Sequence, residues 1–168
     1  MFRVNDKITI AAFILFGDVE LTVKCAGELL KKVPEHDVML TAEAKSIPLI
    51  HEMARQSGMN DYVIARKKPK VYMSDVIETS VNSITTHGEQ NLYLGSEDAQ
   101  KMQGKRVLIV DDVISTGESL AALEKLVETV GGKIVGKAAI LAEGDAADRK
   151  DIIYLEKLPL FDSEGNEI

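Results

Sequence analysis

The stretch that decides the fold is Val107-Leu108-Ile109-Val110-Asp111-Asp112-Val113-Ile114-Ser115-Thr116-Gly117-Glu118-Ser119. Its four apolar residues at 107–110 predict a strand that is buried on both faces. We expect a loop from Asp111 and then a helix over about 119–130, which stops at the Gly131-Gly132 pair. A buried strand followed by a loop and a helix is the repeating unit of a parallel α/β sheet.

The same order of elements occurs elsewhere in the chain. From the N-cap residue Asp18, apolar residues recur at helical spacing as far as Val33, and Pro34 ends the pattern. The other elements expected are strands over 38–42, 62–65 and 134–141, and a helix that begins near Pro48 and ends before Gly58. We therefore predict an α/β fold with a central, mostly parallel sheet flanked by helices.

Between residues 66 and 103 this order fails. Short antiparallel strands are expected at 71–73, 80–84 and 91–94, with the basic run Arg66-Lys67-Lys68-Pro69-Lys70 at their base. Long irregular insertions in compact domains are often functional lids, so we interpret 66–103 as a flexible flap.

Length and charge limit the remaining possibilities. A chain of 168 residues predicts a single domain, 1–168, and its net charge of -7 disfavours a nucleic-acid partner. The longest apolar run, 8–16, is far shorter than the roughly 20 residues that cross a bilayer, so no membrane partner is expected. The single cysteine, Cys25, fits a reducing cytoplasm and is interpreted as a packing residue. The three histidines lack metal-ligand spacing, and we read them as surface or packing residues.

The residues after the central strand carry the chemistry. Two adjacent carboxylates, Asp111 and Asp112, repel one another and lose hydration, so they need hydroxyls, amides or a cation as partners. Residues 115–119 then offer hydroxyls, a glycine for a tight turn and the amides of a helix N-terminus, which together suit a phosphate monoester. Carboxylates for sugar hydroxyls and amides for phosphate predict a ribose 5-phosphate site.

Over these thirteen positions the chain resembles the phosphoribosyl pyrophosphate (PRPP) signature of the type I phosphoribosyltransferases. The resemblance implies that fold, with a β flap and a small hood made from the N-terminal segment and 152–168. The residues that it implies for PRPP are Asp111, Asp112, Val113, Ile114, Ser115, Thr116, Gly117, Glu118 and Ser119. The stretch 43–48 resembles the pyrophosphate loop of the purine-using members. It implies pyrophosphate binding by Ala44, Lys45 and Ser46, with Arg66, Lys67 and Lys70 at the flap.

The reaction implied by the resemblance is transfer of the 5-phosphoribosyl group from PRPP to a purine, giving a nucleoside monophosphate and pyrophosphate in purine salvage. Asp111 and Asp112 would be catalytic by orienting the ribose and favouring its developing positive charge. Mg²⁺ is the implied cofactor, held through PRPP near these two carboxylates. The family implies a homodimer. The expected base pocket comprises Val113, Ile114, 13–16 and 158–161.

Four departures from the family's pattern leave alternatives open. Human-type hypoxanthine-guanine enzymes carry an Asp where this chain has Ser115, and adenine enzymes carry a Glu in the flap, where this chain has Thr86 with Glu89 nearby. Glu118 replaces a small residue and is expected to point to solvent. The lysine that human-type 6-oxopurine enzymes present after the next strand is absent from 140–144, which favours adenine over xanthine, hypoxanthine or guanine. The missing acid motivates a rival function, a non-catalytic PRPP sensor.

Overall fold

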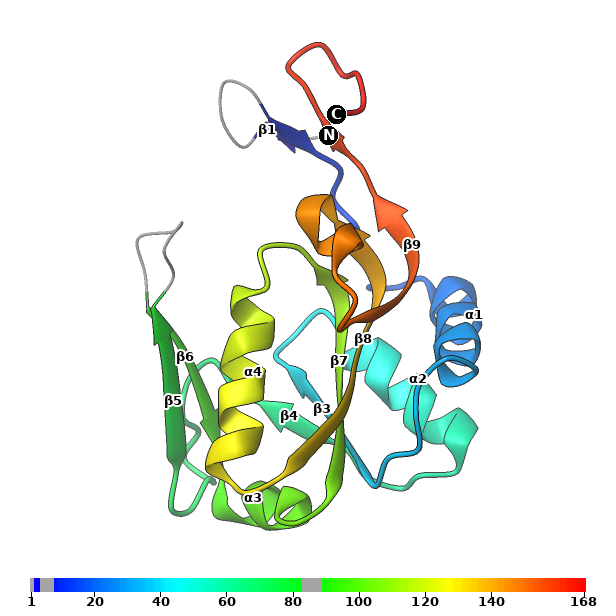
Figure 1. Cartoon of the computed structure of the whole chain (residues 1–168). Helices are drawn as coiled ribbons and strands as arrows, with labels where there is room; N and C mark the ends of the chain where they lie inside the picture. Colours follow the sequence, from blue (N-terminus) through cyan, green and yellow to red (C-terminus); the bar gives the residue numbers. More distant parts are fainter. Residues whose placement is uncertain (1, 4–7, 83–88) are drawn as a thin grey trace.

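The structure is a computed structural model that describes residues 2, 3, 8–82 and 89–168 (Figure 1). Its centre is a five-stranded parallel sheet in the order β4-β3-β7-β8-β9. These strands are β3 (Val38–Ala42), β4 (Val63–Ala65), β7 (Arg106–Ile114), β8 (Lys133–Glu143) and β9 (Ile153–Leu158). The α/β architecture with a parallel central sheet is therefore confirmed.

Helices cover both faces of this sheet (Figure 1). Helices α1 (Val19–Leu30) and α2 (Ile47–Ser57) pack on one face, where Leu29, Met53 and Leu108 share a buried cluster. Helix α4 (Glu118–Thr129) packs on the other face, where Leu123 and Ile109 belong to a second cluster. Burial on both faces explains why the central strands read as apolar runs.

The local signals for the first two helices are confirmed. The Asp18 carboxylate accepts a hydrogen bond from the Leu21 amide at 3.0 Å at the start of α1, and Gly58 ends α2 with a φ of +74°. Helix α1 ends at Leu30, three residues before the expected end of the pattern. Cys25 is buried on the apolar face of α1, as expected, and burial raises the pKa of its thiol.

The strand expected over 107–110 is longer than the sequence indicated. β7 continues to Ile114, so Asp111 and Asp112 lie within the strand and the expected loop from Asp111 is wrong. The reason is that β8 is eleven residues long and keeps pairing with β7 beyond Asp111, as far as the pair of Ile114 with Ala142. Because side chains alternate along a strand, the two carboxylates start from opposite faces of the sheet.

The segment 66–103 contains a hairpin and a helix. β5 (Ile77–Asn82) pairs antiparallel with β6 (Glu89–Leu94), and α3 (Ser96–Met102) follows. The strand expected at 71–73 is wrong, since the Met73 amide donates to the Lys70 carbonyl in a turn. The sequence missed α3, which is only seven residues long. Thr86 and His87 lie outside the described residues.

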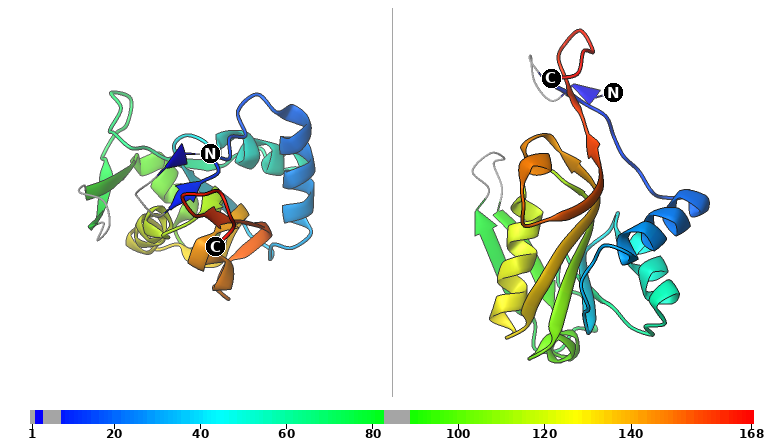
Figure 2. Two further views of the ribbon diagram at one scale, coloured as in Figure 1. Left: turned by 90° about the horizontal axis from the view of Figure 1, so that it is seen from above. Right: turned by 45° about the vertical axis from the view of Figure 1, so that its right-hand side comes forward.

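A small antiparallel sheet lies above the carboxyl ends of the main strands (Figure 2). It joins β1 (Phe2–Arg3), β2 (Thr9–Ile10) and β10 (Leu160–Phe161). Residues 153–158, which the sequence placed in the hood, instead form edge strand β9 of the central sheet. Between β8 and β9 the chain makes a short 3-10 helix, η1 (Gly144–Asp148). In the described part of the chain, no helix is long and apolar enough to span a bilayer.

Candidate functional site

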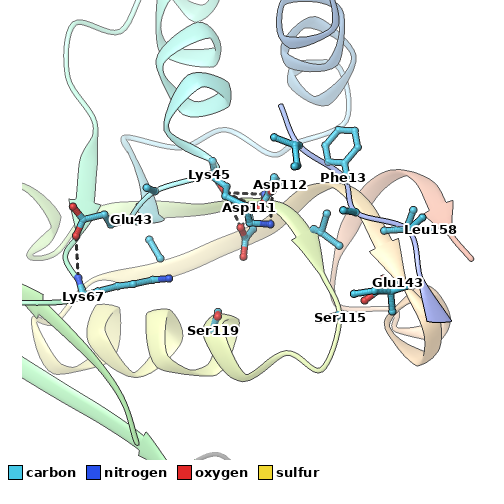
Figure 3. Close-up of a pocket in the computed structure, with 18 residues that line it drawn as sticks. Phe13, Glu43, Lys45, Lys67, Asp111, Asp112, Ser115, Ser119, Glu143 and Leu158 are labelled. Carbon is cyan, nitrogen blue, oxygen red and sulfur yellow. Dashed lines mark hydrogen bonds and ion pairs between the residues drawn. The ribbon is translucent and has the colours of Figure 1, made fainter. Parts of the chain in front are cut away.

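A cavity of about 420 Å³ lies at the carboxyl ends of the parallel strands (Figure 3). It lies between the chain that leads to α1, the loop after β3, the end of β7 and the ends of β8 and β9. Its lining residues are Ile10, Ala11, Ala12, Phe13, Ile14, Ala42, Glu43, Ala44, Lys45, Ser46, Lys67, Asp111, Asp112, Val113, Ser115, Ser119, Glu143 and Leu158. This is the edge of an open parallel sheet where small ligands usually bind.

Ser46 joins the loop after β3 to the two carboxylates of β7. Its hydroxyl donates to Asp111 Oδ1 at 2.7 Å and accepts from the Asp112 backbone amide at 2.9 Å. The contact follows from the sheet register, because Leu40 pairs with Ile109 and the residues after β3 therefore lie beside Asp111 and Asp112. The two segments that the sequence picked out separately, 44–46 and 111–112, thus form one constellation.

Lys45 neutralises one of the two carboxylates. Its ammonium group lies 2.8 Å from Asp112 Oδ2, and the Asp112 side chain is 3% exposed whereas that of Lys45 is 54% exposed. A buried carboxylate requires such a partner, because an unpaired charge away from water is costly. Lys45 also lines the cavity, so its side chain lies within reach of a ligand anion.

The second carboxylate is held in a less favourable environment. Burial raises the pKa of Asp111, and the neighbouring Asp112 charge raises it as well, while the hydrogen bond from Ser46 opposes this shift. Perturbed carboxyls in a cavity are common at functional sites. Asp111 therefore takes up a donor or a cation readily, as a ribose hydroxyl or a metal ion would supply.

We predict that Ser46→Ala raises the pKa of Asp111 further, because the variant lacks the hydroxyl that stabilises the ionised carboxylate. The lost contacts should also lower the free energy of unfolding by about 1 kcal/mol. A ¹³C NMR titration of the Asp111 carboxyl measures the first effect. Ser57→Ala is the control, since that hydroxyl bonds only main-chain carbonyls within α2. An unchanged Asp111 titration in Ser46→Ala would contradict the geometry.

The loop between β7 and α4 forms a second, smaller cavity of about 40 Å³, lined by Asp111 and residues 113–120. Gly117 occupies the N-cap of α4 with a φ of +81°, a left-handed conformation that favours glycine. Because glycine has no side chain, this N-cap contributes no capping oxygen to the first turn, as suits an anion site. Glu118, expected to point to solvent, is instead only partly exposed and lines this cavity.

Arg149 reaches this loop from the segment after η1, and sequence reasoning missed it. Its Nη1 atom lies 2.8 Å from the position that a Cβ on Gly117 would occupy. Asp151 holds the guanidinium through Nε at 3.0 Å and Nη2 at 2.7 Å, and the same carboxylate pairs with Lys137 of β8. Lys137 in turn bonds Glu124 of α4 at 2.6 Å. This chain of ion pairs fixes a cation beside the loop.

The basic run after β4 is organised by an acid that the sequence did not assign to the site. Glu43 accepts a hydrogen bond from the Lys67 amide at 3.2 Å and lies 3.4 Å from Arg66 Nη1 and 3.8 Å from Lys70 Nζ. The Lys67 amide, followed by the two cations, lowers the pKa of Glu43. Of the three basic residues expected at the site, Lys67 lines the cavity, whereas Arg66 and Lys70 are turned to Glu43.

Phe13 and Leu158 lie at one end of the cavity (Figure 3), and the apolar side chains of Ile14 and Val113 also line the cavity. The expected pocket included Ile114, which is 2% exposed in the core and borders only the smaller cavity. Phe16 is 54% exposed, and Leu160 and Phe161 pair with β2. Of the residues expected around the base, Phe13, Ile14, Val113 and Leu158 thus line the cavity.

Comparison with known proteins gives consistent results. Residues 19–161 match the family described as "Phosphoribosyl transferase domain". A hypoxanthine/guanine phosphoribosyltransferase of Methanosarcina mazei is 32% identical over 109 residues, covering 65% of this chain and 53% of that protein. An adenine phosphoribosyltransferase of Cenarchaeum symbiosum is 33% identical over 118 residues, covering 69% of this chain and 66% of that protein. The chain spans about half the length of the hypoxanthine/guanine relatives.

Solved structures show the same architecture. The crystal structure of an adenine phosphoribosyltransferase from Thermoanaerobacter pseudethanolicus is similar with a TM-score of 0.68 at 23% identity, covering 83% of this chain and 80% of that chain. A second one, from Rhodothermus marinus, has a TM-score of 0.67 at 24% identity, covering 83% and 79%. The fold expected from the thirteen-residue signature is confirmed.

Proposed function

Because the chain belongs to the phosphoribosyltransferase family, we propose that it transfers the 5-phosphoribosyl group from PRPP to a purine base and releases pyrophosphate. The observation that carries the proposal is the junction of Ser46, Asp111 and Asp112, which joins the loop after β3 to the strand that leads into the phosphate loop. Two carboxylates and a cation line the larger cavity, and the start of α4 lines the smaller one, which shares Asp111 and Ser115 with it. This arrangement suits a substrate with a ribose, a pyrophosphate and a 5-phosphate.

Each part of PRPP has a corresponding part of the site. The 5-phosphate binds to the loop at 115–119, and the ribose hydroxyls bind to Asp111 and Asp112. The pyrophosphate binds to residues 44–46 and Lys67. Arg66 and Lys70 either stay paired with Glu43 or leave it to contact the pyrophosphate. Carboxylates beside the sugar favour the positive charge that develops at its anomeric carbon as the leaving group departs.

Mg²⁺ fits this site as a partner of the substrate. The described residues contain no group of three or more histidine, cysteine or acidic side chains placed to hold a metal ion. Mg²⁺ commonly binds through one or two carboxylates together with substrate phosphates, and Asp111 and Asp112 supply such carboxylates. When bound, the ion would neutralise charge on the leaving pyrophosphate.

The purine occupies the part of the cavity that is lined by Phe13, Val113 and Leu158. We favour adenine, because 140–144 contains no lysine to donate to a 6-oxo group. Some curated relatives are named hypoxanthine/guanine phosphoribosyltransferase and another is named adenine phosphoribosyltransferase. The preference for adenine is therefore our proposal. Cytoplasmic localisation and a homodimer also stay predictions. Sedimentation equilibrium would test whether the chain forms a dimer.

The test of this function is an assay with PRPP, Mg²⁺ and each of adenine, hypoxanthine, guanine and xanthine in turn. Pyrophosphate release and nucleotide formation are followed together, so that transfer is separated from hydrolysis of PRPP. Nucleotide formation with a purine supports the proposal. If no base is converted while PRPP raises the melting temperature, the chain is a PRPP sensor and the enzyme proposal is wrong.

We predict that Lys45→Gln raises the KM for PRPP about tenfold, because the variant loses a cation beside the pyrophosphate and leaves Asp112 without its ion pair. Steady-state kinetics with varied PRPP measure the change. Lys125→Gln is the matched control, since Lys125 lies on the exposed surface of α4, away from the cavity. Equal KM values for the two variants would remove Lys45 from the binding site.

A further inference from the structure

The carboxylate of Glu143 lies in the cavity and has no role in the proposed mechanism. Glu143 ends β8 and is paired in register with Leu158 of β9, so both residues reach the cavity from adjacent strand ends. Figure 3 shows Glu143 at the same end of the cavity as Phe13 and Leu158, away from Glu43 and Lys67. It therefore belongs to the part of the site that we assign to the base.

This carboxylate lacks a partner of its own. Among the residues that the structure describes, no hydrogen bond or ion pair reaches its oxygens, and the charge that acts on it most is Lys45, already paired with Asp112. Burial raises the pKa of Glu143. A partly buried carboxylate between apolar side chains is unfavourable unless a hydrogen-bond donor contacts it. Because Glu143 lies in the cavity, a bound ligand can supply that donor.

We propose that Glu143 makes the site selective for 6-aminopurines, because its oxygen accepts a hydrogen bond from the 6-amino group of the base. This inference rests on the proposed function and names its substrate class. An amino group at this position donates to the acid, whereas an oxo group places two acceptors against each other. Sites that hydrogen-bond one functional group discriminate strongly against an analogue that lacks it. Glu143 is thus a specificity-determining residue and takes no part in bond breaking.

The test compares the binding of AMP and IMP, whose phosphate and ribose are identical and whose bases differ at the 6-position. Titration calorimetry without PRPP measures the affinity for each nucleotide and requires no turnover. The difference between the two affinities reports the contact with the base. The wild-type protein should bind AMP at least about tenfold more tightly than IMP, as expected for one hydrogen bond to a charged group. In Glu143→Gln the preference should fall to near unity, because the amide can both accept from an amino group and donate to an oxo group.

Two further variants complete the design. Glu143→Ala should weaken AMP binding and leave IMP binding unchanged or stronger. Glu156→Gln, an exposed acid on β9, should retain the wild-type preference. An AMP preference that persists in Glu143→Gln, or its absence from the wild-type protein, would overturn the role of Glu143 while leaving the ribose 5-phosphate site intact. If neither nucleotide binds, the proposed function fails and the inference fails with it.

Discussion

Replacing Asp111 and Asp112 together by asparagine is expected to lower kcat/KM for PRPP by about 10³-fold or more while the chain keeps its fold. Both residues line the cavity, and under the proposed function both act on the sugar, whose positive charge develops during transfer. Removing a single preorganised electrostatic contact typically costs about 10²–10³-fold, and this variant removes two charges. Steady-state kinetics and PRPP titration measure the loss, and circular dichroism checks the fold.

The single variant Asp111→Asn should make the ligand-free protein more stable at neutral pH. Since the pKa of Asp111 is raised in the folded state, the wild-type protein loses stability as pH rises from the ordinary carboxyl value of 3.8 through the raised value. The Asp111→Asn variant does not lose stability in this way. Its melting temperature should therefore exceed that of the wild-type protein slightly at pH 4 and by more at pH 8. A variant that is less stable than the wild type at pH 8 would contradict the environment assigned to Asp111.

Unchanged kinetics in the double variant would remove the two aspartates from the site. Loss of activity through misfolding is a different outcome, and the circular dichroism spectrum separates the two. Asp162→Asn provides a control, because Asp162 is a partly exposed acid that bonds only local groups near the C-terminus. This control should retain wild-type kinetics.

Much of this site was predictable because the carboxyl ends of parallel strands meet at one edge. Asp111 and Asp112 follow the apolar run 107–110, and 44–46 follow the run 38–42, so the sequence alone indicated that both lie near the carboxyl ends of parallel strands. Their direct contact through Ser46 was not predictable. It depends on which strands are neighbours and on the register that pairs Leu40 with Ile109, and neither is encoded locally.

The residues that sequence reasoning missed share one property. Glu43, Glu143 and Arg149 gain their roles from partners distant in the chain, namely Lys67, Leu158 and Gly117. β9 was missed for a related reason. It is an edge strand whose Glu156 and Lys157 are exposed, so it lacks the apolar run that marked the central strands.

Gly117→Ala is expected to lower kcat/KM for PRPP about 100-fold, because its methyl group must displace either Arg149 or the loop at 115–119, to which we assign the 5-phosphate. A Cβ at this position lies 2.8 Å from Arg149 Nη1, and the backbone has a φ of +81°. The left-handed backbone alone costs about 1–2 kcal/mol for an alanine. A loop shifted by about 1 Å can account for a 10²-fold loss in rate.

Gly104→Ala separates the effect of the left-handed backbone from the effect of the contact with Arg149. Gly104 has a comparable φ of +69°, but a Cβ there would meet no atom within 4 Å, and the residue lies in the turn before β7. It should therefore lose about 1–2 kcal/mol of the free energy of unfolding and keep its kcat/KM. If both alanine variants lose the same stability and neither loses activity, Arg149 does not press on the loop. If the double variant Gly117→Ala, Arg149→Ala recovers part of the lost stability, the collision with the guanidinium is the cause. The double variant removes both the collision and the positive charge of Arg149. If its stability recovers but its kcat/KM does not, Arg149 contributes to binding the phosphate.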